Sequence, residues 1–317
     1  MAEPSEKSSP FANRLRKVAP QRMRQAARQG LTAFRLYDSD IPEYRFMVDW
    51  YGGHVHVVEL AGGGFTPAAQ REARAGEVRD AIRDELGVPP ERIHWKTKAP
   101  KVWGQQQYEK LGSGGERVVV EEGGLRFWVN LDDYIDTGLF LDHRLTRARV
   151  GDEARGKRFL NLFCYTGSFT VYAAAGGASE TTSVDLSNTY LDWTQENLEL
   201  NGLWGPRHEL IRSDVTRWCA QERGRLYDLI VLDPPSFSAS KKMAETFDIQ
   251  RDHVRLLDDV LALLAPGGAL YFSTNFTGFQ LDDRALPAFR FAEITPASIP
   301  DDIRNRKVHR CWRITRR

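Results

Sequence analysis

The 317-residue sequence has no apolar run near the roughly 20 residues that a membrane-spanning helix needs, and no apolar N-terminal stretch typical of a signal peptide. Cysteine is scarce, since Cys164, Cys219 and Cys311 are the only three and lie far apart, without the paired spacing of a metal site. Few and unpaired cysteines are typical of a reducing compartment. We therefore expect a cytoplasmic protein with no membrane segment and no metal.

Acidic residues are absent from two basic stretches, although the net charge is only +1. Seven basic residues lie between Phe11 and Leu36, and seven more between Arg304 and Arg317. Such clusters neutralise phosphates along a polynucleotide, whereas a solvated helix face and a frayed tail are the alternative. The candidate phosphate contacts in the first stretch are Arg14, Arg16, Lys17, Arg22 and Arg24.

The first 132 residues predict a short leader and a small α+β domain. Residues 1–10 are small, polar and bounded by proline, which is typical of disorder. Residues 11–132 then begin with a basic helix and contain two hairpin patterns, with turns at Gly52-Gly53 and Gly123-Gly124. Between them, Thr66-Pro67 predicts the start of a helix and Gly87 its end. We expect an antiparallel sheet.

Residues 133–317 show a different pattern, in which short apolar strands alternate with helical segments. The strands are expected near residues 158–165, 181–186, 208–215, 227–235 and 268–276. This alternation predicts a parallel sheet covered by helices on both faces. Ligands of such sheets bind beyond the carboxyl ends of the strands, so those positions are the first to consider.

The predicted strand ends carry a glycine turn and then three acids. The first strand is followed by Gly167, and the second ends at Asp185, 18 residues later, a spacing at which an acid reaches a ribose hydroxyl. Asp214 follows the third strand and could accept from an exocyclic amine, while Asp233 follows the fourth. Aspartate is common at turns and helix caps, which is the alternative for each alone. The series together favours a nucleotide-like ligand, and the missing G-x-G-x-x-G argues against a dinucleotide.

The order of glycine turn, ribose acid, adenine acid and D-P-P resembles that of class I S-adenosylmethionine-dependent methyltransferases. The resemblance implies a Rossmann-like α/β sheet, with residues 291–315 supplying a closing antiparallel pair of strands. It also implies S-adenosyl-L-methionine as cofactor. The implied cofactor residues are Asp142, Arg144, Phe163, Tyr165, Thr166, Gly167, Ser168, Asp185, Leu186, Ser213, Asp214 and Asp233.

Longer strings are more specific. The sequences TGLFLDHR (137–144), NLFCYTGSFTVYA (161–173), LDPPSFSASKKM (232–243) and NRKVHRCW (305–312) resemble the C-terminal half of the bifunctional bacterial large-subunit rRNA guanine methyltransferases, the RlmK-type half of RlmKL. That half forms 7-methylguanine in 23S rRNA. The resemblance implies 23S rRNA or a large-subunit precursor as partner, with Lys241 and Lys242 joining the RNA-binding residues. The preceding half of those enzymes has no counterpart in these residues, so we expect a free-standing version or a piece of a longer chain.

The acceptor atom decides which residues the chemistry needs. Methylation of a pyrimidine C5 requires a positioned cysteine, and the fourth and fifth strand ends have none. Guanine N7 has an in-plane lone pair and no proton to lose, so we expect Asp233 to position the base. Pro234 and Pro235 would hold its edge and Phe237 would stack on its face. Amino acceptors, namely guanine N2 or a protein glutamine, and a catalytically idle RNA-binding module remain alternatives.

Segment 137–144 carries two further candidates. Arg144 is expected to pair with the cofactor carboxylate, or else Asp142 and Arg144 form a local turn or ion pair. His143 follows Asp142 directly, and because adjacent residues on a helix or strand do not face each other, we expect no dyad between them.

Overall fold

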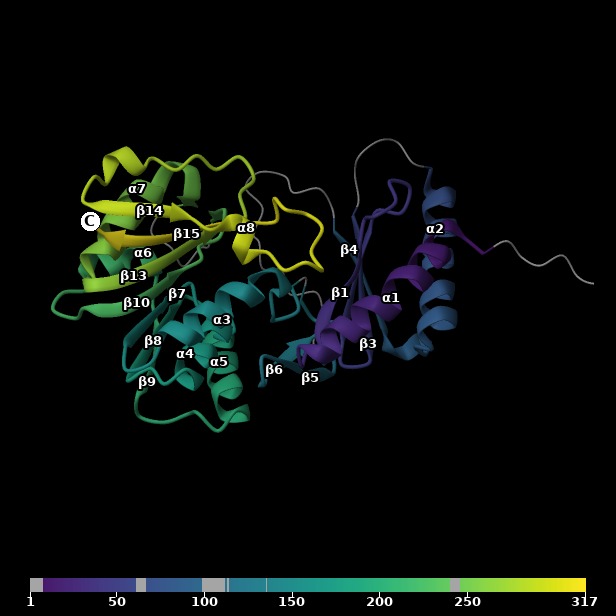
Figure 1. The fold of residues 1–317 in the computed structure, drawn as a ribbon, viewed down its shortest axis with the longest axis horizontal. Coiled ribbons are helices and arrows are strands. Elements are labelled where there is room, and N and C mark those ends of the chain that lie inside the picture. Colours follow the sequence, from purple (N-terminus) through teal and green to yellow (C-terminus); the bar gives the residue numbers. More distant parts are fainter. Residues whose placement is uncertain (1–7, 61–66, 99–111, 113, 135, 240–245) are drawn as a thin grey trace, which may run out of the picture.

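The N-terminal lobe consists of a four-stranded sheet with two long helices (Figure 1). The computed structural model describes residues 8–60, 67–98, 112, 114–134, 136–239 and 246–317. In this lobe the elements are α1 (Pro10–Arg28), β1 (Ala33–Asp38), β2 (Phe46–Tyr51), β3 (His54–Leu60), α2 (Ala68–Leu86) and β4 (Ile93–Lys98), with a 3-10 turn at Pro90–Arg92. The strands lie in the order β1-β2-β3-β4.

Local signals place the helix ends of this lobe. The Ser9 hydroxyl accepts the N–H of Ala12 at 3.1 Å, and Pro10 occupies the first turn of α1. Gly87 ends α2 in the left-handed conformation (φ 66°), as predicted, while Thr66 lies outside the described residues. The expectation of a purely antiparallel sheet is wrong, because β4 pairs with β3 in parallel. A parallel neighbour needs a crossover connection, and α2 provides it.

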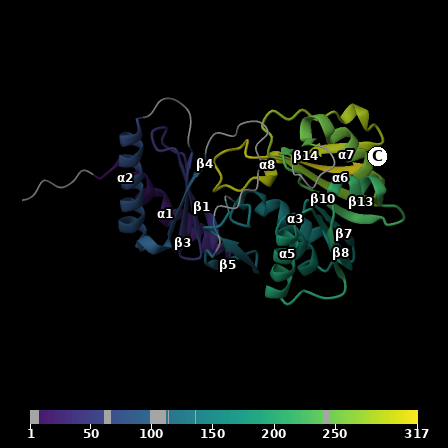
Figure 2. The same cartoon turned by 180° about the vertical axis from the view of Figure 1, so that it is seen from behind.

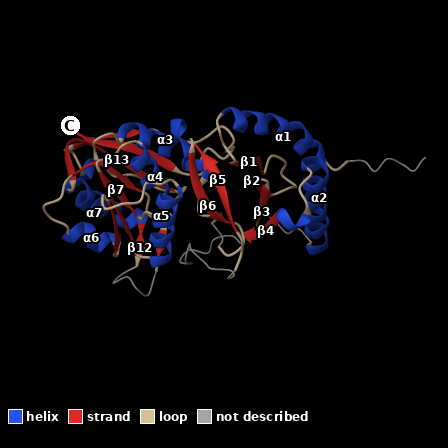
Figure 3. Ribbon diagram, turned by 90° about the horizontal axis from the view of Figure 1, so that it is seen from below, coloured by secondary structure: helices blue, strands red, loops and turns tan. Residues whose placement is uncertain are grey.

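The predicted hairpin at Gly123-Gly124 forms from β5 (Arg117–Glu122) and β6 (Leu125–Asn130), and it makes a separate two-stranded sheet. Figures 1 and 3 show it between the two lobes. Its apolar face shares a core with both, since Phe127 stacks on Tyr172 of the C-terminal lobe and belongs to the same hydrophobic cluster as Tyr51 of the N-terminal sheet. The domain boundary at residue 132 remains a prediction.

The C-terminal lobe has a seven-stranded sheet in the order β14-β15-β13-β10-β7-β8-β9. Its strands are β7 (Arg158–Leu162), β8 (Glu180–Asp185), β9 (His208–Arg212), β10 (Tyr227–Leu232), β13 (Leu264–Thr274), β14 (Phe289–Glu293) and β15 (Arg310–Arg316), with a small pair formed by β11 (Phe237–Ser238) and β12 (Phe247–Asp248). The helices are α3 (Arg144–Glu153), α4 (Ser168–Ala175), α5 (Asn188–Leu200), α6 (Val215–Gln221), α7 (Ile249–Ala262) and α8 (Thr295–Ser298), with 3-10 turns at Leu141–His143 and Asp283–Ala285. None of the helices that the structure describes is long and apolar enough to cross a membrane.

Five neighbouring strands of this sheet, β13, β10, β7, β8 and β9, are parallel. Strand β15 runs antiparallel between β13 and β14. Helices α3, α4 and α5 cover one face and α6 and α7 the other (Figure 3). Alternation along β7 explains both layers, because Leu160 and Leu162 pack toward α6 and α7 while Phe159 packs toward α3 and α4. The predicted doubly covered sheet and its antiparallel closing strands are confirmed.

The loop between α8 and β15 reaches across to the N-terminal lobe, as Figure 2 shows from behind. The backbone N–H groups of Arg304 and Asn305 donate to Oδ2 of Asp38, at 2.8 and 3.0 Å. In return, the N–H of Arg35 donates to Oδ2 of Asp302 at 3.0 Å. His309, at the end of this loop, precedes β15 directly, so the contacts with the N-terminal lobe and His309 lie on one continuous segment.

Candidate cofactor and acceptor site

The turn after β7 brings the backbone into an unusual conformation. Phe163, Tyr165 and Gly167 all have positive φ, at 56°, 51° and 72°. A Cβ on Gly167 would lie 2.2 Å from Cγ2 of Thr194 on α5, so only glycine allows this approach. Thr166 is fully buried and its hydroxyl donates to the carbonyl of Gly138 at 2.6 Å, which ties the turn to segment 137–144. Ser168 then begins α4.

Asp185 lies at the carboxyl end of β8 beside that turn. Its Oδ2 accepts the N–H of Tyr165 at 3.1 Å and its Oδ1 accepts the N–H of Ser187 at 2.9 Å. Burial raises the pKa of Asp185 to about 6, against the opposing effect of these backbone N–H groups. The carboxylate also receives the N–H of Leu186, and its remaining lone pair is suited to accept a ribose hydroxyl.

Ser213 and Asp214 follow β9. Asp214 caps the next helix, which was the alternative to a ligand contact for this acid. Its Oδ1 accepts the N–H groups of Thr216 and Arg217 at 3.0 and 3.3 Å, which caps α6. Ser213 joins the neighbouring strand end through its N–H, 3.0 Å from the carbonyl oxygen of Asp185. A contact of Asp214 with adenine remains a prediction.

Asp233 follows β10 and is held on one side by the next strand. The Ser273 hydroxyl of β13 donates to its Oδ1 at 2.6 Å, while its Oδ2 lies 3.6 Å from Nε2 of His143. Pro234 and Pro235 are buried, and Phe237 is half-buried in the short strand β11, which pairs with β12. The D-P-P segment is therefore rigid and its acid lies at the sheet edge.

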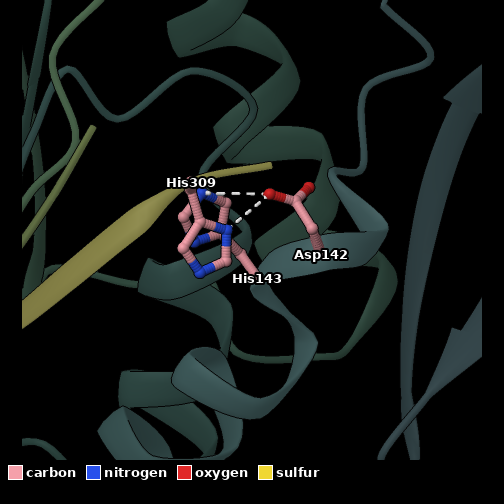
Figure 4. A group of neighbouring side chains, drawn as sticks. All are labelled: Asp142, His143 and His309. Atoms are coloured by element: carbon pink, nitrogen blue, oxygen red, sulfur yellow. Dashed lines mark hydrogen bonds and ion pairs between the residues drawn. The ribbon is translucent and has the colours of Figure 1, made fainter. Parts of the chain in front are cut away.

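The charged residues of segment 137–144 pair with distant partners rather than with each other, and a pairing of Arg144 with the cofactor carboxylate remains a prediction. Arg144 forms a buried ion pair with Asp302, in which its Nη1 lies 3.4 Å from Oδ2. Asp142 instead accepts the Nδ1–H of His309 at 2.7 Å, so the local Asp142–Arg144 pair does not form. Asp142 and His143 form no hydrogen-bonded dyad, because Nε2 and Oδ2 are 3.8 Å apart, but the two adjacent side chains do face each other, contrary to expectation (Figure 4). The reason is the change there from a 3-10 turn to α3, which alters the angle between successive side chains.

Asp142, His143 and His309 offer ligand atoms within 4.8 Å of one another, which raises the question of a metal. The two imidazole rings stack with centroids 4.4 Å apart and planes 10° from parallel. Their in-plane lone pairs therefore lie in nearly parallel planes and do not converge on one ion, as zinc ligands do. This arrangement fits a hydrogen bond between Asp142 and His309, with His143 stacked on His309, better than a metal site.

The basic residues of α1 divide into two groups. Three make contacts inside the protein: Arg14 with Asp40, Arg16 with Glu85, and Arg22 with the carbonyl of Asp301. Together with Arg304 and Arg306, Arg14 and Arg22 line a cavity of about 280 Å³ that is also lined by four aspartates, Asp38, Asp40, Asp301 and Asp302. Lys17 and Arg24 are exposed. The expected Lys241 and Lys242 lie outside the described residues.

Comparison with known proteins identifies the family. Residues 109–295 match the model of a family described as S-adenosylmethionine-dependent methyltransferases. The chain belongs to that family. It is 51% identical over 308 residues to ribosomal RNA large subunit methyltransferase K of Neisseria meningitidis, with 96% of this chain and 87% of that protein covered. It is also 51% identical over 312 residues to ribosomal RNA large subunit methyltransferase K/L of Pseudomonas paraeruginosa, of whose length it spans 43%.

Solved structures confirm the fold of this methyltransferase. SMU.776, crystallised with SAH, superimposes with a TM-score of 0.76 at 24% identity, covering 99% of this chain and 83% of that one. A SAM-dependent methyltransferase from Agrobacterium tumefaciens gives a TM-score of 0.62 at 19% identity, covering 90% of each chain. The expected class I architecture is therefore confirmed, and the family match shows S-adenosylmethionine to be the cofactor.

The residues at the strand ends fit this cofactor. The left-handed turn lets a ligand approach the backbone, and half-buried Asp185 presents a carboxylate beside it. The sequence did not single out Ser273, His143 or His309 as site residues of the methyltransferase. Ser273 stands at the end of the fifth strand, so the strand-end rule that found the acids also applies to it. The pairing of His143 with His309 has no local signal.

Proposed function

We propose that this chain methylates N7 of a guanine in 23S rRNA. The proposal is supported by the 51% identity to a ribosomal RNA large subunit methyltransferase K over 96% of the chain. The observation that carries it is Asp233, an acid fixed by Ser273 at the edge of the sheet beside two buried prolines. Such a group is suited to hold the donor edge of a guanine, while N7 itself needs no base.

The three thiols argue against covalent C5 chemistry. Cys164, Cys219 and Cys311 are all buried. Burial raises the pKa of each thiol above its ordinary value, for Cys311 to about 12. A covalent step needs a thiolate next to the substrate, and these groups stay protonated away from solvent. This supports a nitrogen acceptor over a pyrimidine C5.

Each site residue has a proposed role in binding the cofactor or the acceptor base. When bound, S-adenosylmethionine supplies an electrophilic methyl group. Asp185 would accept a ribose hydroxyl, and the 163–168 turn would lie against the rest of the cofactor. Asp233 and the Pro234-Pro235 backbone would hold the edge of an extruded guanine, with Phe237 stacked on its face. Alignment of acceptor and methyl, with water kept out, then provides the rate acceleration.

Partner and location follow from the same proposal. Lys17 and Arg24 are exposed on α1 and make none of the internal contacts described above, and we expect them to contact rRNA phosphates or those of a large-subunit precursor. Arg14, Arg16 and Arg22 would have to exchange an internal contact for a phosphate. A ribosomal substrate places the enzyme in the cytoplasm, in accord with its three free cysteines.

The decisive experiment maps modified nucleosides in large-subunit rRNA from cells with and without the gene. Loss of one 7-methylguanosine in the deletion strain, restored by the wild-type gene, is the expected result. A complete set of 7-methylguanosines in that strain would overturn the proposal. Loss of an N2-methylguanosine, or of a methylglutamine in a protein, would assign an amino acceptor. Calorimetry with S-adenosylmethionine tests the idle-module alternative, which predicts no binding at high micromolar cofactor.

A further inference from the structure

His143 is buried directly beside the acid that the proposed function assigns to the acceptor. Only 5% of the residue is exposed, and the edge of its ring contacts Phe169 of α4 at a centroid distance of 5.8 Å. Its Nε2 faces two carboxylates, with Oδ2 of Asp233 at 3.6 Å and Oδ2 of Asp142 at 3.8 Å. Nε2 is therefore the atom through which segment 137–144 reaches the D-P-P acid.

A second histidine fixes the orientation of that ring. His309 stacks on His143 with planes 10° apart, and it is itself held at both nitrogens. Its Nδ1–H donates to Asp142 at 2.7 Å (Figure 4), and its Nε2 lies 2.9 Å from the hydroxyl of Ser298. Because His309 cannot rotate without losing these bonds, it forms a rigid surface against which His143 is placed.

The protonation of the group supports a donor at Nε2. Burial, the largest influence, lowers the pKa of His143 although both carboxylates act to raise it, so the ring is neutral at pH 7. A neutral ring has one N–H, and the carboxylates assign it to Nε2. Nδ1 then has no hydrogen-bond partner among the described residues. A buried polar atom left unpaired is unfavourable, and a side chain needed only for packing would be apolar.

Two donors from the described part of the chain, Ser273 and His143, leave Asp233 a defined acceptor face. Ser273 occupies one lone pair of Oδ1, and the Nε2–H of His143 is directed at Oδ2. A carboxylate has about four lone-pair sites, so one on each oxygen remains for a ligand. Guanine offers two adjacent donors on its Watson–Crick edge, the N1–H and the 2-amino group. The 3.6 Å contact is long for a hydrogen bond, and such contacts often tighten only when the substrate is bound.

We propose that His143 is a positioning residue for the acceptor base, whose Nε2–H directs Oδ2 of Asp233 toward the guanine edge while the stacked His309 holds that N–H in place. The inference rests on the proposed function, because it assigns Asp233 to the acceptor. It adds a second element to that site, namely the stacked pair of His143 and His309, which Asp142 anchors. His309 lies at the end of the loop that also contacts the N-terminal lobe.

The test compares two substitutions that separate packing from hydrogen bonding. His143→Gln keeps an N–H donor near Nε2, whereas His143→Phe keeps an aromatic ring on His309 and removes the donor. Methyl transfer to 23S rRNA from the deletion strain is measured for both, with kcat and KM separated. We expect kcat to fall about tenfold or more in His143→Phe and to stay within about threefold of wild type in His143→Gln, with little change in KM.

A structural role predicts the reverse order, because phenylalanine fits an apolar stacked pocket better than glutamine does. Equal or higher kcat in His143→Phe than in His143→Gln would therefore overturn the inference. Cofactor affinity from calorimetry should match wild type in both variants, which shows that the fold is intact. If His143→Phe does not fold, His143→Met, which has no donor and a flexible side chain, takes its place with the same expected loss.

The same assay tests the proposed function and the positioning role of His143 separately. A wild-type enzyme that transfers no methyl group to this rRNA contradicts the proposed function. An active wild-type enzyme whose His143→Phe variant is equally active contradicts only the positioning role of His143.

Discussion

The backbone N–H of Tyr165 donates to the carboxylate of Asp185 at 3.1 Å, and this bond joins the glycine turn after β7 to the end of β8. One half-buried acid thereby orders the turn and remains available to the cofactor. Its ionisation should control cofactor binding.

Cofactor affinity should fall as the pH drops through 6. The pKa of Asp185 is raised to about 6, so the carboxylate is largely ionised at pH 7 and largely protonated at pH 5. A ribose hydroxyl donates to the ionised form, and we expect the Kd for S-adenosylmethionine to rise about tenfold over that interval. Calorimetry at both pH values measures it. Asp185→Asn serves as control and should bind weakly without this pH dependence; the same dependence in that variant would mean that another group titrates.

Asp233→Ala should separate catalysis from cofactor binding. Loss of a preorganised hydrogen-bonding group typically costs on the order of 100-fold in kcat, and we expect at least that loss here. The Kd for S-adenosylmethionine should stay nearly unchanged. Asp228→Ala, at the opposite end of β10 where the acid accepts the N–H of Arg158, is the matched control and should keep its activity. Normal turnover in Asp233→Ala would refute the role of this acid.

Gly167→Ala should damage the turn far more than a matched glycine substitution. The new Cβ would meet the Thr194 side chain at 2.2 Å, and the Thr194 hydroxyl is held by its bond to the carbonyl of Tyr165 at 3.1 Å. Gly156 has almost the same φ, 71° against 72°, but nothing within 4 Å of a new Cβ. We expect about 1 kcal/mol of destabilisation for Gly156→Ala from its φ, and about 1–3 kcal/mol more for Gly167→Ala from overpacking.

Chemical denaturation measures both variants, and the cofactor Kd should rise only in Gly167→Ala. Similar losses of stability in the two would show that the contact with Thr194 is relieved by a small shift.

The buried ion pair between Arg147 and Glu122 should hold the hairpin on the C-terminal lobe. Their side chains are 1% and 0% exposed, and two parallel bonds of 2.7 and 2.8 Å join them. Arg147→Met leaves a buried charge unpaired, which typically costs about 3–5 kcal/mol. The double variant Arg147→Met with Glu122→Leu should recover much of that loss, since well-packed apolar residues often replace such pairs without cost.

Thermal and denaturant unfolding compare these variants with Arg149→Met, an exposed position on the same helix. A small effect of Arg147→Met, similar to that of Arg149→Met, would show that water or a rearrangement compensates Glu122.

The sequence alone determined the C-terminal sheet and which residues follow the carboxyl ends of its strands. Its strands are short apolar runs separated by helices, and parallel strands place their carboxyl ends together, so Gly167, Asp185 and Asp233 could be expected at one site. The N-terminal lobe was harder, because the short strand β4 is polar, IHWKTK, and only its place after α2 makes it a parallel neighbour of β3.

Only the tertiary structure decided which polar groups are engaged. Arg144 pairs with Asp302, 158 residues away, and Asp142 pairs with His309, 167 residues away. Sequence patterns report local periodicity and the burial of a whole face, whereas the partner of a single charged side chain depends on where distant segments pack. The stack of His143 on His309 is of that second kind, since it exists only because the loop before β15 returns to the start of α3.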